Sequence, residues 1–132
     1  MPQIIVLDTH AWLWYVNRNV EKYPAHWDEL IASVDQVGVS AVSCFEIALA
    51  SKRGRIVLKC PIDEWFSGAL KQADVELFPL TPMIAMQAVN LAPVHRDPFD
   101  RIIIATALEY GAKLATVDGL FVDYPELTGR LL

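Results

Sequence analysis

Four carboxylates stand where a charged side chain is unfavourable, either at the end of an apolar run or on an apolar helix face. They are Asp8, Glu46, Asp100 and Asp118. A buried carboxylate is costly unless it is paired, hydrogen-bonded or bound to a metal ion. If these four converge, their oxygens form a site of the kind that Mg²⁺ or Mn²⁺ prefers. Metal ions held in this way activate water and stabilise the leaving oxygen in phosphodiester hydrolysis.

Two of the acids directly follow short apolar runs. Asp8 follows residues 4–7 and Asp118 follows residues 114–117. Such runs are typical of buried parallel strands, and sites in open α/β sheets form beyond the carboxyl ends of the strands. Each aspartate alone is better explained locally, Asp8 as a helix N-cap and Asp118 as the start of a turn with Gly119. Both together favour a shared crevice.

The other two acids lie on apolar faces of expected helices. Glu46 has Val42 and Ala50 one turn to either side, and Asp100 has Ile104 one turn later. A surface glutamate more often has polar neighbours, and the structural alternative for Glu46 is an ion pair with an arginine across the core. The burial penalty favours a functional role for both acids.

Asp97 behaves differently from Asp100. Because Pro98 follows it, Asp97 fits an N-cap whose side chain accepts the backbone N–H of Phe99 or Asp100. Asp97 is therefore expected to be structural and Asp100 a metal ligand. Asp97 stays a candidate for contacts around the site or for a second metal ion.

The elements that must position these residues alternate along the chain. Apolar patterning and capping signals predict strands at 3–7, 36–39, 75–80 and 113–117. They predict helices at 9–17, 25–34, 41–52, 62–73, 82–91 and 98–110, with a tail that holds turn signals and one more short element. Alternation of this kind predicts parallel βαβ units and a sheet covered on both faces. We expect one α/β domain spanning residues 1–132.

Composition narrows the class further. The chain is 54 % hydrophobic and 20 % charged, as in compact globular proteins rather than disordered ones. Its net charge of −5 does not indicate a basic nucleic-acid binder, although bound divalent ions would cancel part of it. No apolar stretch reaches the roughly 20 residues that cross a bilayer. Without a signal peptide or disulfide pattern, we expect a cytoplasmic protein with no membrane contact.

The remaining reactive side chains give weaker signals. The three histidines lack the paired spacing of zinc ligands. His95 lies near the acids and could touch substrate, but it is interpreted as a surface-loop residue. The tryptophans are expected in the core or on a protein-binding surface rather than stacked on bases. Lys52, Arg53 and Arg55 follow the Glu46 helix, and a cationic helix end accounts for this grouping as well as a phosphate-contacting rim does.

Four ordered segments resemble the motifs of the PIN-domain family, most closely its VapC-type toxin branch. They are Ile5–Ala11, Ser43–Ala48, His95–Arg101 and Ala115–Asp118. The resemblance spans nearly the whole chain, and the order and spacing of all four acids match. It implies a PIN-like twisted parallel sheet of four to five strands flanked by helices. It also implies Mg²⁺- or Mn²⁺-dependent hydrolysis of single-stranded RNA, a partner antitoxin whose tail enters the acidic groove, and a homodimer.

The resemblance also assigns residues by position. The acidic quartet is Asp8, Glu46, Asp100 and Asp118, with the metal held by Asp8, Asp100 and Asp118. Thr116 matches a position often held by a small hydroxyl residue. Candidates for contacts around the site or with the RNA backbone are Asp97, Thr116, Arg101, Lys52, Arg53 and Arg55. The sequence does not locate the dimer surface, for which the exposed parts of the first two helices are one option.

Other classes fit parts of the pattern. A metal-dependent DNA nuclease would use the same acids. No feature of the sequence indicates recognition of a 2′-hydroxyl, so the acids alone do not distinguish RNA from DNA. A phosphatase with an aspartyl nucleophile commonly carries a second aspartate where this chain has His10. A Mg²⁺-binding signalling or interaction module would need an acidic neighbour beside Asp8 and a lysine after the last strand, and neither is present. A catalytically silent PIN-like subunit is opposed by the intact quartet.

Overall fold

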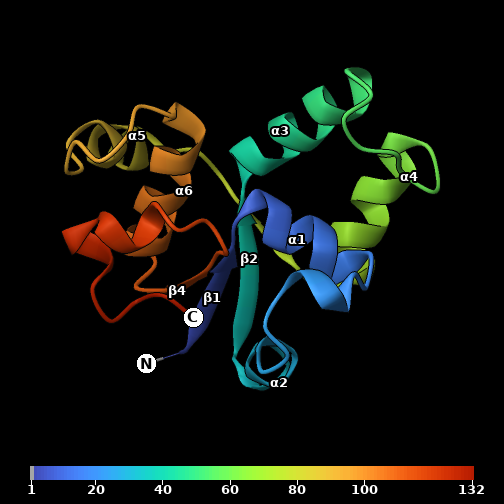
Figure 1. The fold of residues 1–132 in the computed structure, drawn as a ribbon, viewed down its shortest axis with the longest axis horizontal. Coiled ribbons are helices and arrows are strands. Elements are labelled where there is room, and N and C mark those ends of the chain that lie inside the picture. The colour runs from blue at the N-terminus through green and yellow to red at the C-terminus, as the bar shows by residue number, and fades with distance from the viewer. Residues whose placement is uncertain (1) are drawn as a thin grey trace.

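The computed structural model describes residues 2–132, and within them the chain forms a parallel sheet flanked by helices (Figure 1). The strands are β1 (Ile4–Leu7), β2 (Gln36–Ser40), β3 (Glu76–Phe78) and β4 (Lys113–Ala115), in the order β3-β2-β1-β4. The helices are α1 (Thr9–Val16), α2 (Trp27–Ser33), α3 (Ala41–Lys52), α4 (Ile62–Ser67), α5 (Pro82–Val89) and α6 (Pro98–Glu109). The expected α/β fold class is confirmed.

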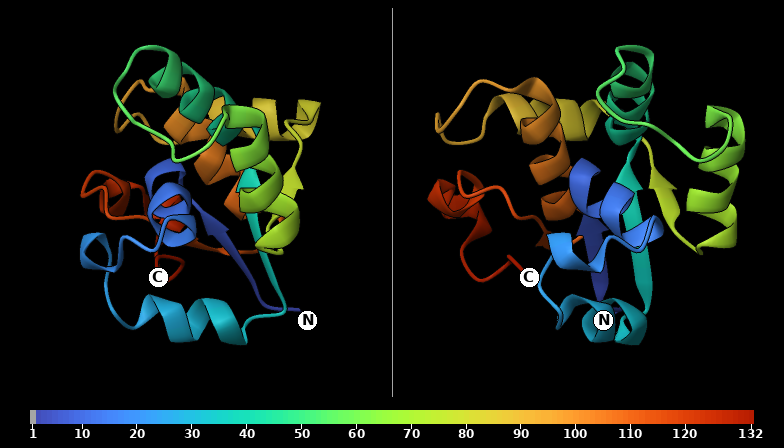
Figure 2. Two further views of the ribbon diagram at one scale, coloured as in Figure 1. Left: turned by 90° about the vertical axis from the view of Figure 1, so that its right-hand side faces the viewer. Right: turned by 45° about the vertical axis from the view of Figure 1, so that its right-hand side comes forward.

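The sheet separates two cores because successive side chains of a strand point to opposite faces. Ile5 and Leu7 of β1 pack with α1, α2 and α4, where the core includes Trp12, Trp27 and Trp65, as expected for these tryptophans. Ile4 and Val6 contact the opposite core, formed by α6 and the C-terminal segment. In the right-hand view of Figure 2, α6 and the red C-terminal segment lie to the left of the strands and α4 lies to the right.

The strands end together at one edge of the sheet. Leu7 is level with Val39 of β2 and Ala115 of β4, and the Asp8 backbone N–H donates to the Ala115 carbonyl at 3.0 Å. The residues that follow β1, β2 and β4 therefore emerge side by side. We call this the carboxyl edge.

Close packing between strands requires a glycine in β2. A Cβ atom built on Gly38 would lie 2.2 Å from the ring of Phe78 in β3. The Phe78 ring in turn stacks on Tyr110 at the end of α6, with 4.0 Å between centroids. Gly38 thus lets β3 approach β2 while Phe78 fills the core beneath α6.

Several element bounds differ from those expected. β3 is shorter than 75–80 because the Val75 N–H closes the preceding helical turn on the Leu70 carbonyl and Pro79 has no N–H for the ladder. The helix expected at 62–73 changes at Gly68 into a π-helical turn, Gly68–Gln72. Short 3₁₀ turns occur at Val20–Lys22, Phe121–Asp123 and Pro125–Leu127.

One further helix and one further strand are shorter than expected. The helix expected at 25–34 begins only at Trp27, whose N–H donates to the Pro24 carbonyl in a turn. The last strand ends at Ala115 because the Thr116 hydroxyl accepts the Asp118 N–H at 3.0 Å, which replaces the strand ladder by a turn. None of the helices described for residues 2–132 has the length and apolar character to cross a membrane.

Candidate acidic site

Asp8 serves as an N-cap and also lies at the carboxyl edge. Its Oδ1 accepts the Ala11 backbone N–H at 2.8 Å and so starts α1. The side chain is 7 % exposed, and this burial raises the pKa of Asp8. Hydrogen bonds from Thr116 and Ala11 oppose the rise in that pKa by favouring the charged form. Asp8 can therefore cap α1 and also belong to the predicted acidic site.

Glu46 is held against α1 by a hydroxyl group. Ser40 ends β2 and caps α3, which places Glu46 in the second turn of that helix. The Thr9 hydroxyl donates to Glu46 Oε1 at 2.6 Å and lies 2.9 Å from the Ser43 Oγ. Burial raises the pKa of Glu46, the Thr9 bond lowers it, and the charge of Asp97 raises it further. The contact to Glu46 thus comes from Thr9, where an arginine was the structural alternative.

The pKa of Asp100 is well above that of an ordinary aspartate. It lies in the first turn of α6, whose N-cap Asp97 accepts the N–H of Phe99 at 2.9 Å and that of Asp100 at 3.5 Å. The predicted cap is therefore present. Burial and, after it, neighbouring negative charge raise the pKa of Asp100 to about 7. The charges come from Asp97, Glu46, Asp118 and Asp8. These contributions indicate that the four predicted acids lie near one another.

Asp118 is the exposed member of the quartet. It stands three residues beyond β4, and its Oδ1 accepts the Leu120 N–H at 2.9 Å, so it also starts the turn expected with Gly119. Its charge raises the pKa of both Asp8 and Asp100. Asp118 therefore contributes to the negative potential of the carboxyl edge from a loop.

His95 is not the surface-loop residue that the sequence suggested. Its side chain is only 14 % exposed, and its Nε2 lies 3.4 Å from Asp100 Oδ2. This separation is long for a hydrogen bond, so the contact is mainly electrostatic. The Nδ1 atom lies 2.9 Å from the Tyr124 hydroxyl, which comes from the C-terminal segment. The position of His95 five residues before Asp100 was the one sequence signal for this contact.

Arg101 has a structural role that differs from the expected RNA contact. Its guanidinium donates to five backbone carbonyls at the end of α5 and in the loop that precedes α6, those of Ala88, Val89, Leu91, Ala92 and His95. The planar group satisfies carbonyls that the helix end leaves without partners. Arg101 therefore anchors the loop that presents His95, and its donors are engaged within the protein.

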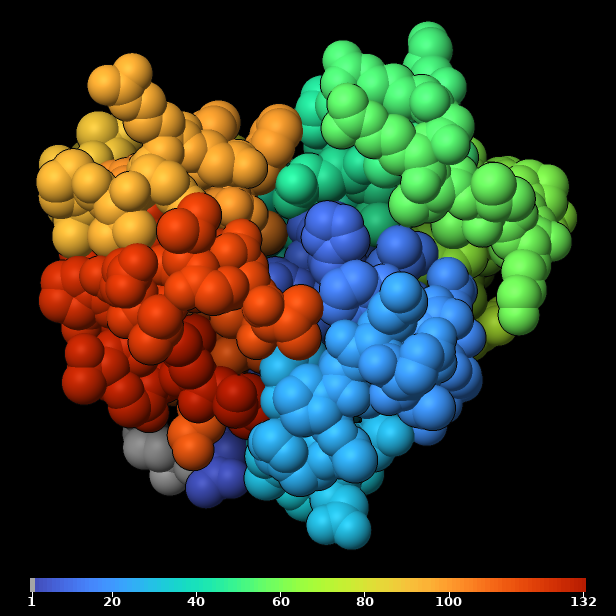
Figure 3. Space-filling view, in the orientation of Figure 1, coloured from blue at the N-terminus to red at the C-terminus, as the bar shows by residue number. Residues whose placement is uncertain are grey.

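Two other arginines border the acids. A hollow of about 310 Å³ between α1, α3 and α6 is lined by Thr9, His10, Glu46, Phe99, Arg53 and Arg55 among others. Lys52 is exposed near the end of α3 and does not line it. In the space-filling view the surface is notched between the green α3 region and the orange α5–α6 region, with α1 at the base of the notch (Figure 3).

The donor set suits a hard divalent cation. Across the described residues 2–132 there is no cluster of three His, Cys, Asp or Glu side chains already in coordinating geometry. Neighbouring carboxylate charges nevertheless raise the pKa values of Asp8, Glu46 and Asp100, so the quartet shares a space of negative potential with only oxygen donors. A divalent cation in that space would relieve the repulsion and draw the carboxylates inward.

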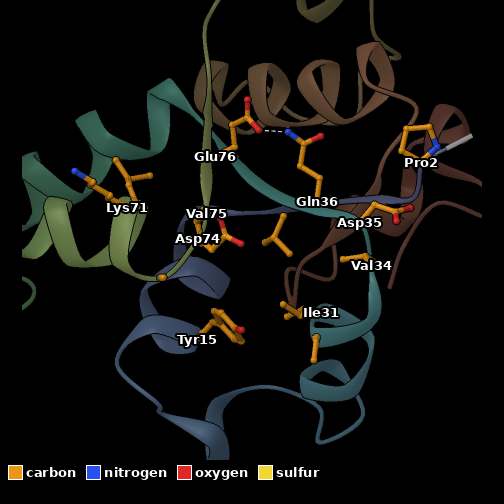
Figure 4. A pocket seen from close by; sticks show the side chains of 14 residues that line it. Pro2, Tyr15, Ile31, Val34, Asp35, Gln36, Lys71, Asp74, Val75 and Glu76 are labelled. Carbon is orange, nitrogen blue, oxygen red and sulfur yellow. Dashed lines mark hydrogen bonds between the residues drawn. The ribbon is translucent and has the colours of Figure 1, made fainter.

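A separate hollow lies away from these acids. It measures about 810 Å³ and is lined by residues of α1, α2, the start of β2 and the segment before β3, including Tyr15, Ile31 and Val75 (Figure 4). Gln36 and Glu76 form a hydrogen bond across its wall. No residue of the predicted site lines it. The chemistry expected from the sequence is thus confined to the carboxyl edge.

The fold and this edge define a class: a parallel α/β domain with a carboxylate-rich site where its strands end. The family model of the PIN domain matches residues 5–127. This chain belongs to the PIN-domain family.

This chain is also similar to individual proteins, one by sequence and two by structure. Ribonuclease VapC22 of Mycobacterium tuberculosis (strain ATCC 25618 / H37Rv) is 32 % identical over 115 residues, which cover 86 % of each protein. Two solved structures share the fold at 16 % identity. VapBC2 from Rickettsia felis, bound to a DNA fragment from its promoter, has a TM-score of 0.69 over 95 % of this chain and 96 % of that one. VapBC-1 from nontypeable Haemophilus influenzae has a TM-score of 0.68 over 98 % and 96 %.

Proposed function

We propose that this protein is a metal-dependent endoribonuclease that hydrolyses single-stranded RNA and acts as the toxin of a toxin–antitoxin pair. The observation that carries the proposal is the coupling of Asp8, Glu46, Asp100 and Asp118 at the carboxyl edge. The 32 % identity to a named ribonuclease supports RNA as the substrate. Family membership favours a nuclease over a phosphatase or a signalling module.

The four acids would have different roles in the reaction, according to their positions. Asp8, Asp100 and Asp118 would hold Mg²⁺ or Mn²⁺, which suits their all-oxygen donor set. The bound ion supplies a Lewis acid that lowers the pKa of water and offsets the charge of the phosphodiester. Glu46, fixed by the Thr9 hydroxyl, would accept the proton of the attacking water. Thr116, which lowers the pKa of Asp8, would favour the charged form of that carboxylate.

The residues around the quartet would orient it and receive the substrate. His95 faces Asp100 and is fixed by Tyr124, so it would position that carboxylate. Asp97 acts as the N-cap that sets the start of α6. Arg53 and Arg55 line the adjoining hollow, where they would contact RNA phosphates, and the exposed Lys52 would steer the strand at longer range.

The test of substrate class compares two strands of identical sequence. Purified protein with Mg²⁺ or Mn²⁺ is incubated with a mixed-sequence single-stranded RNA and with the matching DNA. We expect cleavage of RNA alone, and none with EDTA. Cleavage of DNA at an equal rate would replace the ribonuclease proposal by a general nuclease. Absence of cleavage of either strand by folded protein would count against a nuclease of broad sequence range.

An antitoxin partner is supported by the fold shared with toxin–antitoxin complexes. Its tail would enter the notch beside the quartet and block access to the metal. We also infer that the protein works in the cytoplasm, where RNA is present and where its free cysteines Cys44 and Cys60 remain reduced.

We further propose a homodimer formed through α5. The sequence left the dimer surface open, with the exposed parts of the first two helices as one option, but on α1 the apolar residues Ala11, Trp12 and Leu13 are buried. On α5 the side chains of Met83, Met86 and Val89 are exposed in a row, and Val89 is 79 % exposed. The chain carries no Asp, Glu, Lys or Arg between Phe78 and Arg96. An uncharged apolar face of this kind suits a second copy of the same surface.

A further inference from the structure

An exposed aromatic pair bridges two helices beside the acidic site. Phe45 on α3 is 56 % exposed, and its ring contacts that of Phe99 on α6, with 5.5 Å between centroids and 39° between planes. A single exposed phenylalanine needs no explanation. Two rings that meet across separate elements form a continuous apolar surface, which solvent would disfavour unless something covers it.

The position of the pair ties it to the quartet. Each phenylalanine immediately precedes an acid, Phe45 before Glu46 and Phe99 before Asp100. Phe99 also lines the hollow that holds Glu46, Arg53 and Arg55. An aromatic surface, two cations and Glu46 thus adjoin one another where α3 and α6 border the notch (Figure 3).

We propose that Phe45 and Phe99 form a stacking platform for an unpaired RNA base next to the scissile phosphate, while Arg53 and Arg55 contact a neighbouring phosphate. This inference rests on the proposed ribonuclease function and adds to it a binding subsite. Every base has a π face, so stacking on aromatic side chains gives affinity with little sequence preference. Aromatic contact is especially useful here because the acids themselves repel the RNA backbone.

The experiment measures RNA binding separately from cleavage. A short single-stranded RNA that carries 2-aminopurine is titrated with protein in Ca²⁺, and a gel checks that it stays intact. Stacking quenches the fluorescence of 2-aminopurine. Phe45→Leu removes the ring but keeps an apolar side chain on the surface, and Phe45→Tyr keeps the ring. Because Phe45 is exposed, neither substitution opens a cavity in the core.

We expect quenching with the wild type and with Phe45→Tyr, and an affinity about 5- to 100-fold weaker with Phe45→Leu, the range that corresponds to loss of one base stack. If Phe45→Leu binds the RNA as tightly as the wild type, Phe45 and Phe99 do not form a stacking platform. The exposed pair would then be a candidate contact surface for a protein partner. A wild type that cleaves RNA in that case keeps the proposed function and loses only this inference. A wild type that neither binds nor cleaves RNA removes both.

Discussion

His95 Nε2 lies 3.4 Å from Asp100 Oδ2, and the other nitrogen of the same ring lies 2.9 Å from the Tyr124 hydroxyl. The imidazole therefore connects the start of α6 with the C-terminal segment. When a side chain contacts a residue that binds a metal ion, the contact fixes the orientation of that metal ligand. We expect His95 to orient Asp100 in this way when a cation is bound.

Replacing His95 by Ala should lower divalent-ion affinity and RNA cleavage by about 10- to 100-fold, the usual range for loss of a contact behind a metal ligand. Tyr124→Phe keeps the ring in the core but removes the hydroxyl, so it should cause a smaller loss in the same direction. Isothermal titration with Mn²⁺ and a cleavage assay measure the two effects. Unchanged values for both variants would mean that Asp100 needs no support.

Stability without metal should fall as pH rises. Burial and neighbouring charges raise the pKa of Asp100 from 3.8 to about 7. Because the folded pKa exceeds the unfolded one, the unfolded state loses its proton first, and stability falls between about pH 4 and pH 7. The raised pKa values of Asp8 and Glu46 act in the same direction.

Urea unfolding in EDTA checks this prediction. The wild type should be less stable at pH 8 than at pH 5, and Asp100→Asn should be more stable than the wild type at pH 8 by about 1–2 kcal/mol, after allowance for solvent screening. At pH 5 the difference between the two proteins should be less than half as large, because only part of the proton-linked penalty has developed there. A wild type whose stability rises between pH 5 and pH 8 would contradict the described coupling.

Arg101→Ala should destabilise the fold by about 2–4 kcal/mol, because it removes donors from buried and half-buried carbonyls. Arg101→Lys should recover little, since a single ammonium cannot reach carbonyls spread around a planar fork. The matched control is Arg53→Ala, an exposed arginine whose loss should change stability by less than about 0.5 kcal/mol. Equal unfolding midpoints for Arg101→Ala and Arg53→Ala would refute the anchoring role.

Self-association should depend on the α5 face. Met86→Glu places a charge in the middle of the exposed row, so it should shift the protein from dimer to monomer in light scattering at micromolar concentration. Leu30→Glu on α2 is the control, because Leu30 is also an exposed apolar residue but lies on the first two helices, the other option for the dimer surface. A monomer produced only by Leu30→Glu would support that option instead.

Local features such as helix caps could be predicted from the sequence more fully than contacts between distant residues. The N-caps Ser40 and Asp97 follow from residue type and the proline after Asp97, and both are present. The acids were recognised because burial of charge is rare, a rule that needs no knowledge of partners. The Thr9–Glu46 bond joins residues 37 positions apart, and no periodicity predicts which hydroxyl meets which carboxylate.

The loop before α6 shows the limit most clearly. His95 and Arg101 were interpreted from their neighbours in sequence, as a surface residue and a substrate contact. Their real partners are Asp100, Tyr124 and the carbonyls at the end of α5, which are set by how the loop folds over the helix. Irregular segments carry no repeating pattern, so their contacts emerge only from the tertiary structure.

The most direct test of the central claim is the rate of cleavage of a mixed-sequence single-stranded RNA, with Mg²⁺ or Mn²⁺, by the wild type, Asp8→Asn, Asp100→Asn and the control Asp63→Asn. Asparagine keeps the N-cap of α1 at position 8 and removes only the charge. Asp63 is an exposed acid in the first turn of α4. We predict metal-dependent cleavage by the wild type and Asp63→Asn, and its loss in both site variants. Cleavage that survives Asp8→Asn and Asp100→Asn would contradict an acidic metal site as the catalytic centre.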